Sequence, residues 1–401
     1  MKLVIWRRFV AVLVAVVIGS LGLAATPAQA QAAKKMIRYG TRVDDAFTTL
    51  AALSDGSYVT GGYQDNNRNY WRTFIMRYSK AGKLLWKKQT SIESYFTFEV
   101  AKQIVVANDM AVAYSYSRSG KKLWRAKLAT RSGCSRDGAV SIVGSKAGPG
   151  MFALSNCEAW GSVDASILVD GYNSRGQLQW ERAIPAGLFD EARTLVATRD
   201  GGYMVGGHAR NNNVPNCTSC SYTEPSNPVL AKFGPAGNLE WTYTDDRSAP
   251  AFAGTGFDYV SITELSAGGY VALQRAQKGN AETSILVGFS ADGRKSWESS
   301  GTCSPDAVYH PTPQLLQVDG GLVTIGRQQA GLCKWSLAGA TEWGVAYKGI
   351  KFQAIVGDGR GGLVAVGEAG KRAPSVPGKS HGGTDAVIGH FNGQGKLSAW
   401  R

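Results

Sequence analysis

The sequence is poor in the residues that most often carry catalysis, and it has few long apolar stretches. It has only four histidines among 401 residues, and none stands in a zinc-protease motif, a nucleophile elbow or a P-loop. After residue 25, no apolar run approaches the ~20 residues that a membrane-spanning helix needs. These shortages disfavour the common metalloprotease, α/β-hydrolase and nucleotide-binding classes, and a transmembrane segment in the rest of the chain.

The first thirty residues have the pattern of an export signal. Basic Lys2, Arg7 and Arg8 precede an apolar run over residues 9–25, which ends in the small-x-small pattern of residues 28–30. We expect cleavage after Ala30 and a periplasmic or secreted protein; a retained anchor is the alternative. No cysteine follows the apolar run, so the signal is not of the lipoprotein type.

The chain is basic, with a formal net charge of +14. Loss of the three basic residues of the signal lowers this charge to +11 (14 − 3). A positive surface favours acidic partners, such as an anionic polysaccharide or an acidic envelope protein. Because lysine and arginine are dispersed along the sequence, the charge can equally serve solubility alone.

One motif, Gly-x-x-x-Trp, recurs through the chain and sets its organisation. The first six copies keep this spacing, and the last, Gly395 with Trp400, carries one extra residue. The seven tryptophans are Trp86, Trp124, Trp180, Trp241, Trp297, Trp343 and Trp400. We expect the glycine to form the turn between the third and fourth strands of a unit, and the tryptophan to start the fourth strand and pack between neighbouring units.

A second recurring turn precedes the first in most units. Residues 55–58, Asp-Gly-Ser-Tyr, and residues 200–203, Asp-Gly-Gly-Tyr, lie between apolar runs and are typical of hairpin turns. Four short strands per unit of about 40–60 residues indicate an all-β fold, a single β-propeller of residues 31–401. The expected blades are residues 44–90, 98–130, 131–184, 188–245, 256–300, 305–347, and 350–401 joined by 35–41.

The ends of the chain suggest how such a ring closes. The last unit stops at the start of its fourth strand, and residues 35–41 can supply or extend that outer strand. We therefore expect seven four-stranded blades closed by the N-terminal strand, with eight blades, or a pair of β-sandwiches, as alternatives.

The pairing of Asp-Gly-Gly-Tyr with Gly-Lys-x-x-Trp resembles the PQQ-like propeller repeats of bacterial exported proteins, over essentially all of residues 35–401. One branch of that group, the quinoprotein dehydrogenases, carries a quinone cofactor, calcium and often adjacent disulfide-bonded cysteines, and this chain has no adjacent cysteines. Another branch includes non-catalytic outer-membrane assembly lipoproteins, whose lipid-attachment cysteine is absent here. The resemblance implies a non-enzymatic member of the group.

Six cysteines in an exported chain predict three disulfides. Cys134 and Cys157 lie symmetrically about a predicted hairpin turn near residues 145–146, and Cys303 and Cys333 lie symmetrically about the turn at residues 319–320. Each bridge would link facing strand ends. For Cys217 and Cys220 we expect a loop-closing disulfide; a zinc site lacks a fourth ligand, and a redox motif lacks a following helix.

Acidic residues recur just before the first predicted strand of six units. First strands line the channel of a propeller, so these residues could form a ring around one mouth and bind a cation such as calcium, or another ligand. Alternatively, each caps its own loop by accepting backbone N–H groups. The six residues are Asp45, Glu99, Asp137, Asp190, Asp258 and Asp306.

Long connections form a second candidate surface. Residues 64–71, 208–226 and 369–384 each follow a second strand, so they should gather on one face and offer side chains for binding. The candidates are Tyr70, Trp71, Arg210, Asn211 and Tyr222. We therefore predict a monomeric binding or scaffold module with a protein or polysaccharide partner and no cofactor, calcium being the one considered. The alternative is a lyase or quinone-dependent oxidoreductase that uses the channel mouth.

Overall fold

The computed structural model divides the chain into two compact units, Met1–Ala33 and Lys34–Arg401, and everything below concerns the second. The structure describes residues 36–65, 71–91, 96–108, 110, 112–128, 139–158, 165–185, 188–189, 191–210, 226–246, 255–278, 281–299, 315–325, 331–378, 380–381 and 383–400. In these ranges every regular element is a β-strand, and no helix is long and apolar enough to cross a membrane.

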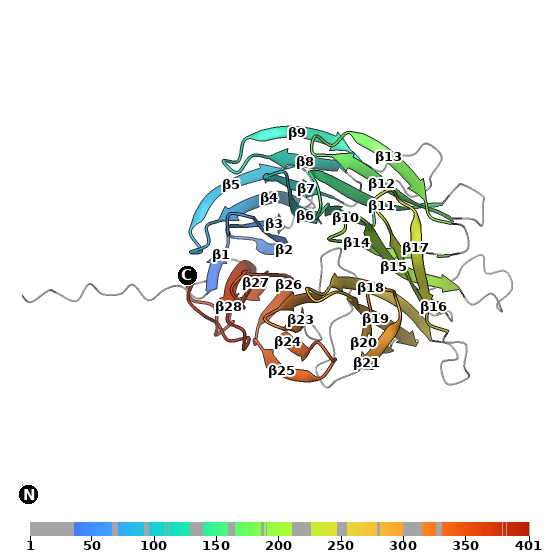
Figure 1. Cartoon of the computed structure of the whole chain (residues 1–401). Helices are drawn as coiled ribbons and strands as arrows, with labels where there is room; N and C mark the ends of the chain where they lie inside the picture. Colours follow the sequence, from blue (N-terminus) through green and yellow to red (C-terminus); the bar gives the residue numbers. More distant parts are fainter. Residues whose placement is uncertain are drawn as a thin grey trace, which may run out of the picture. The chain divides into compact units, whose positions relative to one another are not determined.

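Most of the strands form separate four-stranded antiparallel sheets. In four of these sheets the strands lie in the order in which they follow one another in the chain. The first strand lies innermost and the fourth outermost, in the arrangement of a β-propeller (Figure 1). These sheets are β2 (Asp44–Ala52), β3 (Tyr58–Asp65), β4 (Trp71–Tyr78) and β5 (Leu84–Thr90); β6 (Phe96–Val100), β7 (Gln103–Ala107), β8 (Val112–Tyr116) and β9 (Lys122–Lys127); β10 (Ser141–Gly144), β11 (Gly150–Glu158), β12 (Ala165–Asn173) and β13 (Leu178–Ala183); and β22 (Leu315–Val318), β23 (Gly321–Ile325), β24 (Gly331–Ser336) and β25 (Thr341–Ala346).

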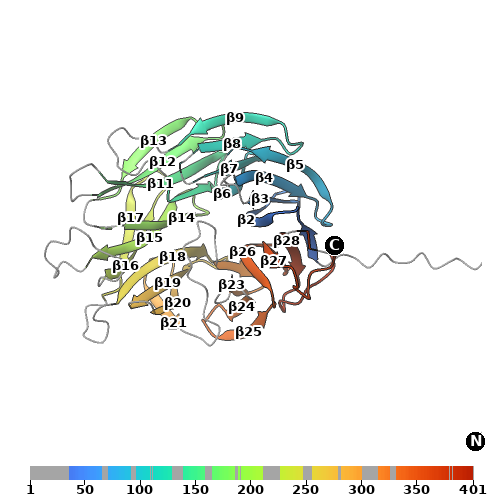
Figure 2. The ribbon, with the colours of Figure 1, turned by 180° about the vertical axis from the view of Figure 1, so that it is seen from behind.

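A fifth sheet joins the two ends of the described chain. Its order is β1 (Met36–Tyr39), β28 (Thr384–Phe391), β27 (Leu363–Gly370) and β26 (Ile350–Gly357). The N-terminal strand β1 runs antiparallel to β28, with Met36 opposite Gly389 and Tyr39 opposite Ala386. It therefore takes the outer position that the fourth strand holds in the other sheets, as the sequence led us to expect for residues 35–41 (Figure 2).

The remaining strands form a single eight-stranded sheet. It contains β14 (Glu191–Ala197), β15 (Tyr203–Arg210), β16 (Ser226–Phe233) and β17 (Leu239–Thr244), followed by β18 (Gly256–Glu264), β19 (Tyr270–Lys278), β20 (Ala281–Phe289) and β21 (Lys295–Ser299). One parallel pair, Ser226 with Gly256, joins the two groups of four, and the Ser226 hydroxyl bonds both the N–H and the carbonyl of Phe257. The structure thus has five separate four-stranded sheets, not the seven predicted, because this link merges eight strands into one sheet.

The recurring glycines adopt the backbone conformation that the turn motifs predict. All seven glycines of the Gly-x-x-x-Trp motif have φ between 69° and 83°, a region that side chains with a Cβ rarely adopt. In the first six units, the tryptophan that follows is the third residue of the fourth strand. The turn and the strand start are therefore encoded together in one short motif.

Each tryptophan of the motif, with one exception, lies on the glycine turn of the next unit. A Cβ added at Gly120, Gly176, Gly293, Gly339 or Gly395 would lie only 2.4–3.2 Å from the indole of the preceding unit. The indole N–H groups of Trp86 and Trp124 also donate to the carbonyls of Arg118 and Ser174 in those turns, at 2.8 and 2.9 Å. The exception is Gly237, which faces the side chain of Arg182. These contacts confirm that the tryptophans pack between units.

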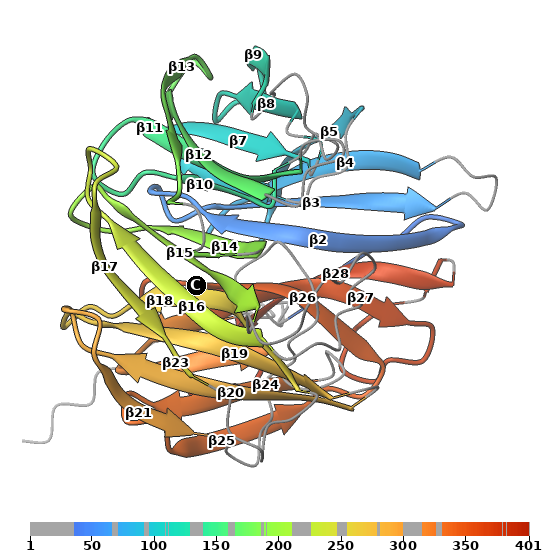
Figure 3. The same ribbon diagram turned by 90° about the vertical axis from the view of Figure 1, so that its right-hand side faces the viewer.

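The last tryptophan makes the same contact with the first unit. A Cβ added at Gly82 would lie 2.7 Å from the ring of Trp400, which also packs against Tyr58 with ring centroids 5.8 Å apart. Nearby, the N–H of Thr384 donates to a carboxylate oxygen of Asp44 at 2.6 Å. Figure 3 shows β2 and β28 side by side from another direction. The C-terminal residues are thus packed on the first sheet, although residue 401 is not described.

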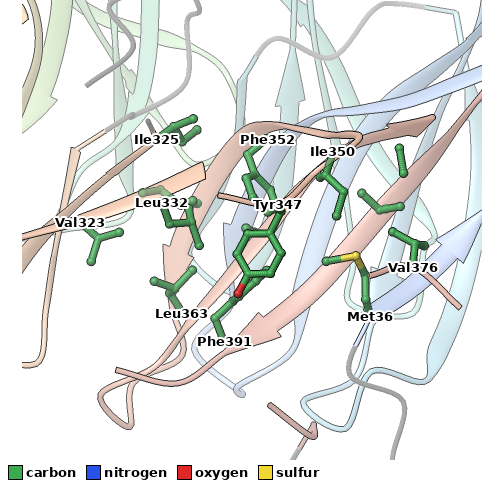
Figure 4. Close-up of a cluster of buried hydrophobic side chains, with 14 of the residues drawn as sticks. Met36, Val323, Ile325, Leu332, Tyr347, Ile350, Phe352, Leu363, Val376 and Phe391 are labelled. Atoms are coloured by element: carbon green, nitrogen blue, oxygen red, sulfur yellow. The ribbon is translucent and has the colours of Figure 1, made fainter. Parts of the chain in front are cut away.

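The apolar core is divided among the contacts between sheets. The cluster in Figure 4 illustrates one of them: Val323 and Leu332 of the β22–β25 sheet pack with Phe352 and Phe391 of the next sheet, and Met36 of β1 completes it. Phe352 and Phe391 meet edge-to-face at 5.7 Å. Strands with apolar residues on both faces are expected in a propeller, because each sheet is covered by a neighbour on either side.

Candidate functional site: the end where the first strands begin

The two ends of the sheets differ. At one end the turns from first to second strand and from third to fourth strand are short; 53–57, 79–83 and 198–202 each have five residues. At the other end, where the first strands begin, the connections vary: residues 66–70 separate β3 from β4, and residues 211–225 separate β15 from β16. We call this second end the start end. Trp71 and Arg210 lie at strand termini there, whereas Tyr70, Asn211 and Tyr222 lie outside the described residues.

The first strands carry a common irregularity that allows the repeats to be compared. A β-bulge follows Phe47 in β2, Ala192 in β14, Tyr259 in β18 and Phe352 in β26. Asp45 lies two residues before Phe47, the residue that precedes the bulge in β2, whereas Asp258 lies one residue before its equivalent in β18, Tyr259. The two acids therefore do not occupy the same register position, so they are not strict repeats of one another.

Asp45 is fully buried and caps its own loop. Its carboxylate accepts the backbone N–H of Thr41 at 2.6 Å, the Thr41 hydroxyl at 2.9 Å and the side-chain amide of Gln64 at 2.9 Å. Burial raises the pKa of Asp45 above its ordinary value, more than these hydrogen bonds lower it, and the neighbouring carboxylate of Asp385 adds to the rise. Asp385 itself is paired with Arg38 at 2.6 Å. These contacts are those of the capping alternative.

Asp258 is the centre of a buried ionic cluster between β14–β15 and β18–β19. Its Oδ2 atom receives Arg193 Nε and Arg275 Nη2, each at 2.9 Å, and His208 Nδ1 lies 3.6 Å from Oδ1, beyond hydrogen-bond reach. Burial acts to raise the pKa of Asp258, but His208 and the two guanidinium groups outweigh it and hold the pKa below its ordinary value. Arg193 also pairs with Glu191 at 2.6 Å. This cluster cross-links the two halves of the eight-stranded sheet.

Glu99 lies at the opposite end of its sheet, so the predicted ring is wrong in its placement of this residue. It is the fourth residue of β6, and it accepts the N–H of Ser54, in the β2–β3 turn, at 2.6 Å. Arg118, in the β8–β9 turn, pairs with both Glu99 and Asp55. The sequence placed Glu99 before a strand because β6 is short and its Val-Ala-Lys turn contains no glycine. Asp137, Asp190 and Asp306 lie outside the described residues.

A Ser–His–Asp chain, which the sequence did not predict, links the last sheet to the C-terminal segment. His390 Nδ1 lies 2.5 Å from Ser398 Oγ, and its Nε2 lies 2.9 Å from Asp358 Oδ2. The backbone N–H groups of Arg360 and Gly362 donate to Asp358 Oδ1. Burial acts to raise the pKa of Asp358, but these N–H groups and His390 outweigh it and lower the pKa.

Comparison of the repeats suggests a structural, not a catalytic, role for the Ser–His–Asp contacts. His390 lies in the third strand of its sheet, opposite the second residue of the second strand. Arg77 occupies the same position in the first sheet, and Lys232 occupies it in the β14–β17 group. Arg77 pairs with the turn carboxylate of Asp55 at 2.5 Å, and Lys232 pairs with that of Asp200 at 2.8 Å. His390 therefore occupies the strand position of Arg77 and Lys232, and its partner Asp358 lies in the corresponding turn, two residues before the position that Asp55 and Asp200 hold and that Arg360 holds here.

The cysteines are described only in part. Cys333 is disulfide-bonded and almost fully buried. It lies in β24, the third strand of its sheet, so it does not face β22 across the 319–320 turn as predicted; β23 ends at Ile325, and the chain has already begun another strand when it reaches Cys333. Cys134, Cys217, Cys220, Cys303 and the side chain of Cys157 lie outside the description. The three pairings stay predictions.

Neither end of the sheets holds a recognisable metal centre in the part of the chain that is described. No group of three or more His, Cys, Asp or Glu residues there is placed to hold a metal ion. The three candidate acids in that part of the chain, Asp45, Glu99 and Asp258, are engaged by guanidinium groups, a hydroxyl and N–H groups of the protein itself. Fold and site together define a β-propeller in which Asp258 and Glu99, two of the candidate acids, link neighbouring sheets or groups of strands.

Comparisons with known proteins do not assign the chain to a family. No family model and no curated protein matches the chain. Among solved structures, it is similar to BamB from Moraxella catarrhalis, with 11% identity, a TM-score of 0.41, and coverage of 86% of this chain and 85% of that one. It is also similar to a protein of unknown function from Bacteroides caccae, with 11% identity, a TM-score of 0.39, and coverage of 76% and 94%. At these values neither likeness carries an argument about function.

Proposed function

We propose that the chain is an exported β-propeller that acts as a binding or scaffold module for a protein or polysaccharide partner, in the cell envelope or outside the cell. The observation that carries this proposal is the contrast between the two ends of the sheets. One end has short turns of two to five residues, whereas the start end has connections of variable length that reach 15 residues between β15 and β16. Loops held on a rigid scaffold are where binding most often resides.

Two observations support seven blades and a closed ring. The eight-stranded sheet consists of two antiparallel groups of four strands joined by one residue pair, so it counts as two blades. Trp400 lies on the Gly82 turn as the other tryptophans lie on the turns that follow them, and β1 completes the last sheet. In this interpretation residues 1–30 are the export signal, and the mature chain is monomeric.

An affinity experiment with the start end altered tests the proposal. The protein is immobilised and exposed to fractionated envelope proteins and to purified envelope polysaccharides. A variant with residues 211–225 replaced by a short Gly-Ser linker should lose at least tenfold in affinity for the retained partner. Replacement of Pro235 and Ala236, exposed in the short turn between β16 and β17 at the opposite end, is the matched control and should leave binding unchanged.

Two outcomes would overturn the proposal. Retention of neither a protein nor a polysaccharide would remove the binding role. Dye-linked dehydrogenase activity that requires added pyrroloquinoline quinone and calcium would instead establish the enzymatic alternative.

A further inference from the structure

Among the outer strands that carry the repeated motif, with the turns before them, positive charge is concentrated in those of the first two sheets. Residues 79–91 contain four lysines, and residues 117–128 contain three lysines and two arginines, with no acidic residue in either segment. Their net charges are therefore +4 and +5. The equivalent segments 173–185, 234–246, 290–299, 336–347 and 392–400 have net charges of +1, −3, 0, −1 and +1. The first two of these seven segments therefore hold nine of their 14 basic residues.

The residues on either side of the motif tryptophan also differ between β5 and β9 and the other outer strands. The residue before the motif tryptophan is Leu85 in β5 and Leu123 in β9, both 45% exposed; in the four other outer strands it is Gln, Glu, Ser or Glu. The residue after the tryptophan is Lys87 or Arg125 in these two strands, and Glu, Thr, Glu or Gly in the others. Since all six strands have the same fold, folding does not require the combination of leucine and cation.

The two strands form one continuous surface. Trp86 of β5 lies on the β8–β9 turn, where its indole donates to the Arg118 carbonyl, and a Cβ added at Gly120 would lie 3.2 Å from Lys88 Cε. We call this surface the basic rim. It consists of Lys80, Lys83, Leu84, Leu85, Lys87 and Lys88 with Lys121, Lys122, Leu123, Arg125 and Lys127, all exposed.

The cations of the basic rim are not used to hold the protein together by ion pairs. Within the described ranges, none of the eight has a carboxylate within ion-pair distance, whereas Arg193, Lys232 and Arg275 in the interior all do. The Nζ atom of Lys87 lies over the Tyr39 and Phe74 rings and donates to the Tyr39 hydroxyl, and the Nζ atom of Lys122 lies over the Tyr114 ring, so these two ammonium groups rest on aromatic faces. No carboxylate of the described residues neutralises any of the eight charges, and all eight side chains are exposed.

We propose that the basic rim docks the protein on a membrane surface that bears anionic headgroups. Lysines near such a surface each add about 1 kcal/mol of attraction, and apolar side chains among them can enter the boundary between headgroups and acyl chains. The leucines decide between lipid and a soluble polyanion, because a soluble polyanion would engage the cations without needing Leu84, Leu85 and Leu123. Lysines on an outer strand can also prevent its edge from pairing with a strand of another molecule, but that role does not explain the exposed leucines beside them. The docking is independent of the partner bound at the start end.

Vesicle co-sedimentation of the purified protein tests this docking. We expect sedimentation with vesicles of phosphatidylcholine and phosphatidylglycerol, and none with phosphatidylcholine alone. Combined Lys83→Glu, Lys121→Glu and Lys127→Glu changes should lower the partition coefficient about a hundredfold. The matched control, combined Arg175→Glu, Lys371→Glu and Arg372→Glu, makes the same change in net charge at exposed cations elsewhere and should lower it by far less.

The leucines are tested separately, with retention on heparin as the soluble-polyanion arm. Combined Leu85→Ser and Leu123→Ser changes should lower vesicle binding about tenfold and leave heparin retention unchanged. Leu178→Ser with Leu239→Ser, which are 54% and 42% exposed on other outer strands, is the control and should have no effect. Each variant must keep the denaturation midpoint of the parent protein.

Three results would overturn the inference: no sedimentation with anionic vesicles, an equal loss in the two charge-reversal triples, or leucine variants that bind vesicles as the parent does. Retention on heparin without vesicle binding would assign the basic rim to a soluble polyanion instead. A failure here leaves the start-end binding experiment unaffected, because that experiment alters residues 211–225 and uses no lipid.

Discussion

The contact between Gly82 and Trp400 offers the most direct test of the proposed ring closure. Gly82 has φ of 73°, and a Cβ there would lie 2.7 Å from the Trp400 indole. Gly56 is a matched control, because its φ is 76° and an added Cβ would meet only the Lys80 side chain, at 3.8 Å. The two substitutions to alanine therefore share the backbone strain and differ in the clash with Trp400.

The magnitudes follow from these two terms. An alanine in the left-handed region costs about 1–2 kcal/mol, so Gly56→Ala should lower the free energy of unfolding by that amount. Insertion of a methyl group into a packed contact typically costs about 1–3 kcal/mol more, so Gly82→Ala should lower it by about 2–5 kcal/mol. In a Trp400→Ala background the excess should disappear, which leaves a coupling free energy of about 1–3 kcal/mol.

Urea denaturation followed by tryptophan fluorescence and circular dichroism measures these differences, provided that the m-values stay equal. Equal losses for Gly82→Ala and Gly56→Ala, or an excess that persists without the indole, would refute closure through this contact. The propeller would then be held together at its ends by β1 alone.

Further predictions concern the ionic cluster, the serine and the disulfides. Asp258→Asn removes the carboxylate that the buried Arg193 and the partly buried Arg275 share and should lower the free energy of unfolding by about 3–5 kcal/mol, whereas Asp292→Asn at an exposed turn should have little effect in the same denaturation assay. Because the pKa of Asp258 is lowered in the folded state, its stabilisation is present above the unfolded pKa of about 3.9 and should be lost as the pH falls below it; thermal unfolding against pH should show a smaller acid loss in Asp258→Asn than in the parent. A fluorophosphonate serine probe should leave Ser398 unmodified, and labelling of it would support hydrolase chemistry. Non-reducing peptide mapping should find Cys303 joined to Cys333, and a different partner would contradict the predicted pairing.

Much of the fold could be predicted because the information is local. The Gly-x-x-x-Trp motif combines a residue that tolerates positive φ with an indole that needs a large contact, so each copy specifies a turn and the strand that follows it. The motif could not reveal that Ser226 and Gly256 join two groups into one sheet, since that pair depends on how adjacent groups lie in space.

The candidate site was much harder to predict. Asp45 and Asp258 look alike before a strand, yet one caps a loop and the other neutralises two arginines brought from separate strands. Glu99 was misplaced because its short strand lacks a glycine turn, and His390 was passed over because its partners lie 32 residues before and eight after it.

The sequence by itself determined the repeat unit, its turns and the position of its packing tryptophans, because these rest on local backbone preferences and on burial at fixed spacing. Only the tertiary structure decided which charges meet. The basic segments 79–91 and 117–128, which are separate in the chain, lie on adjacent outer strands, and Arg193 and Arg275 converge on Asp258, because each sheet meets its neighbours through residues that are far apart in the chain.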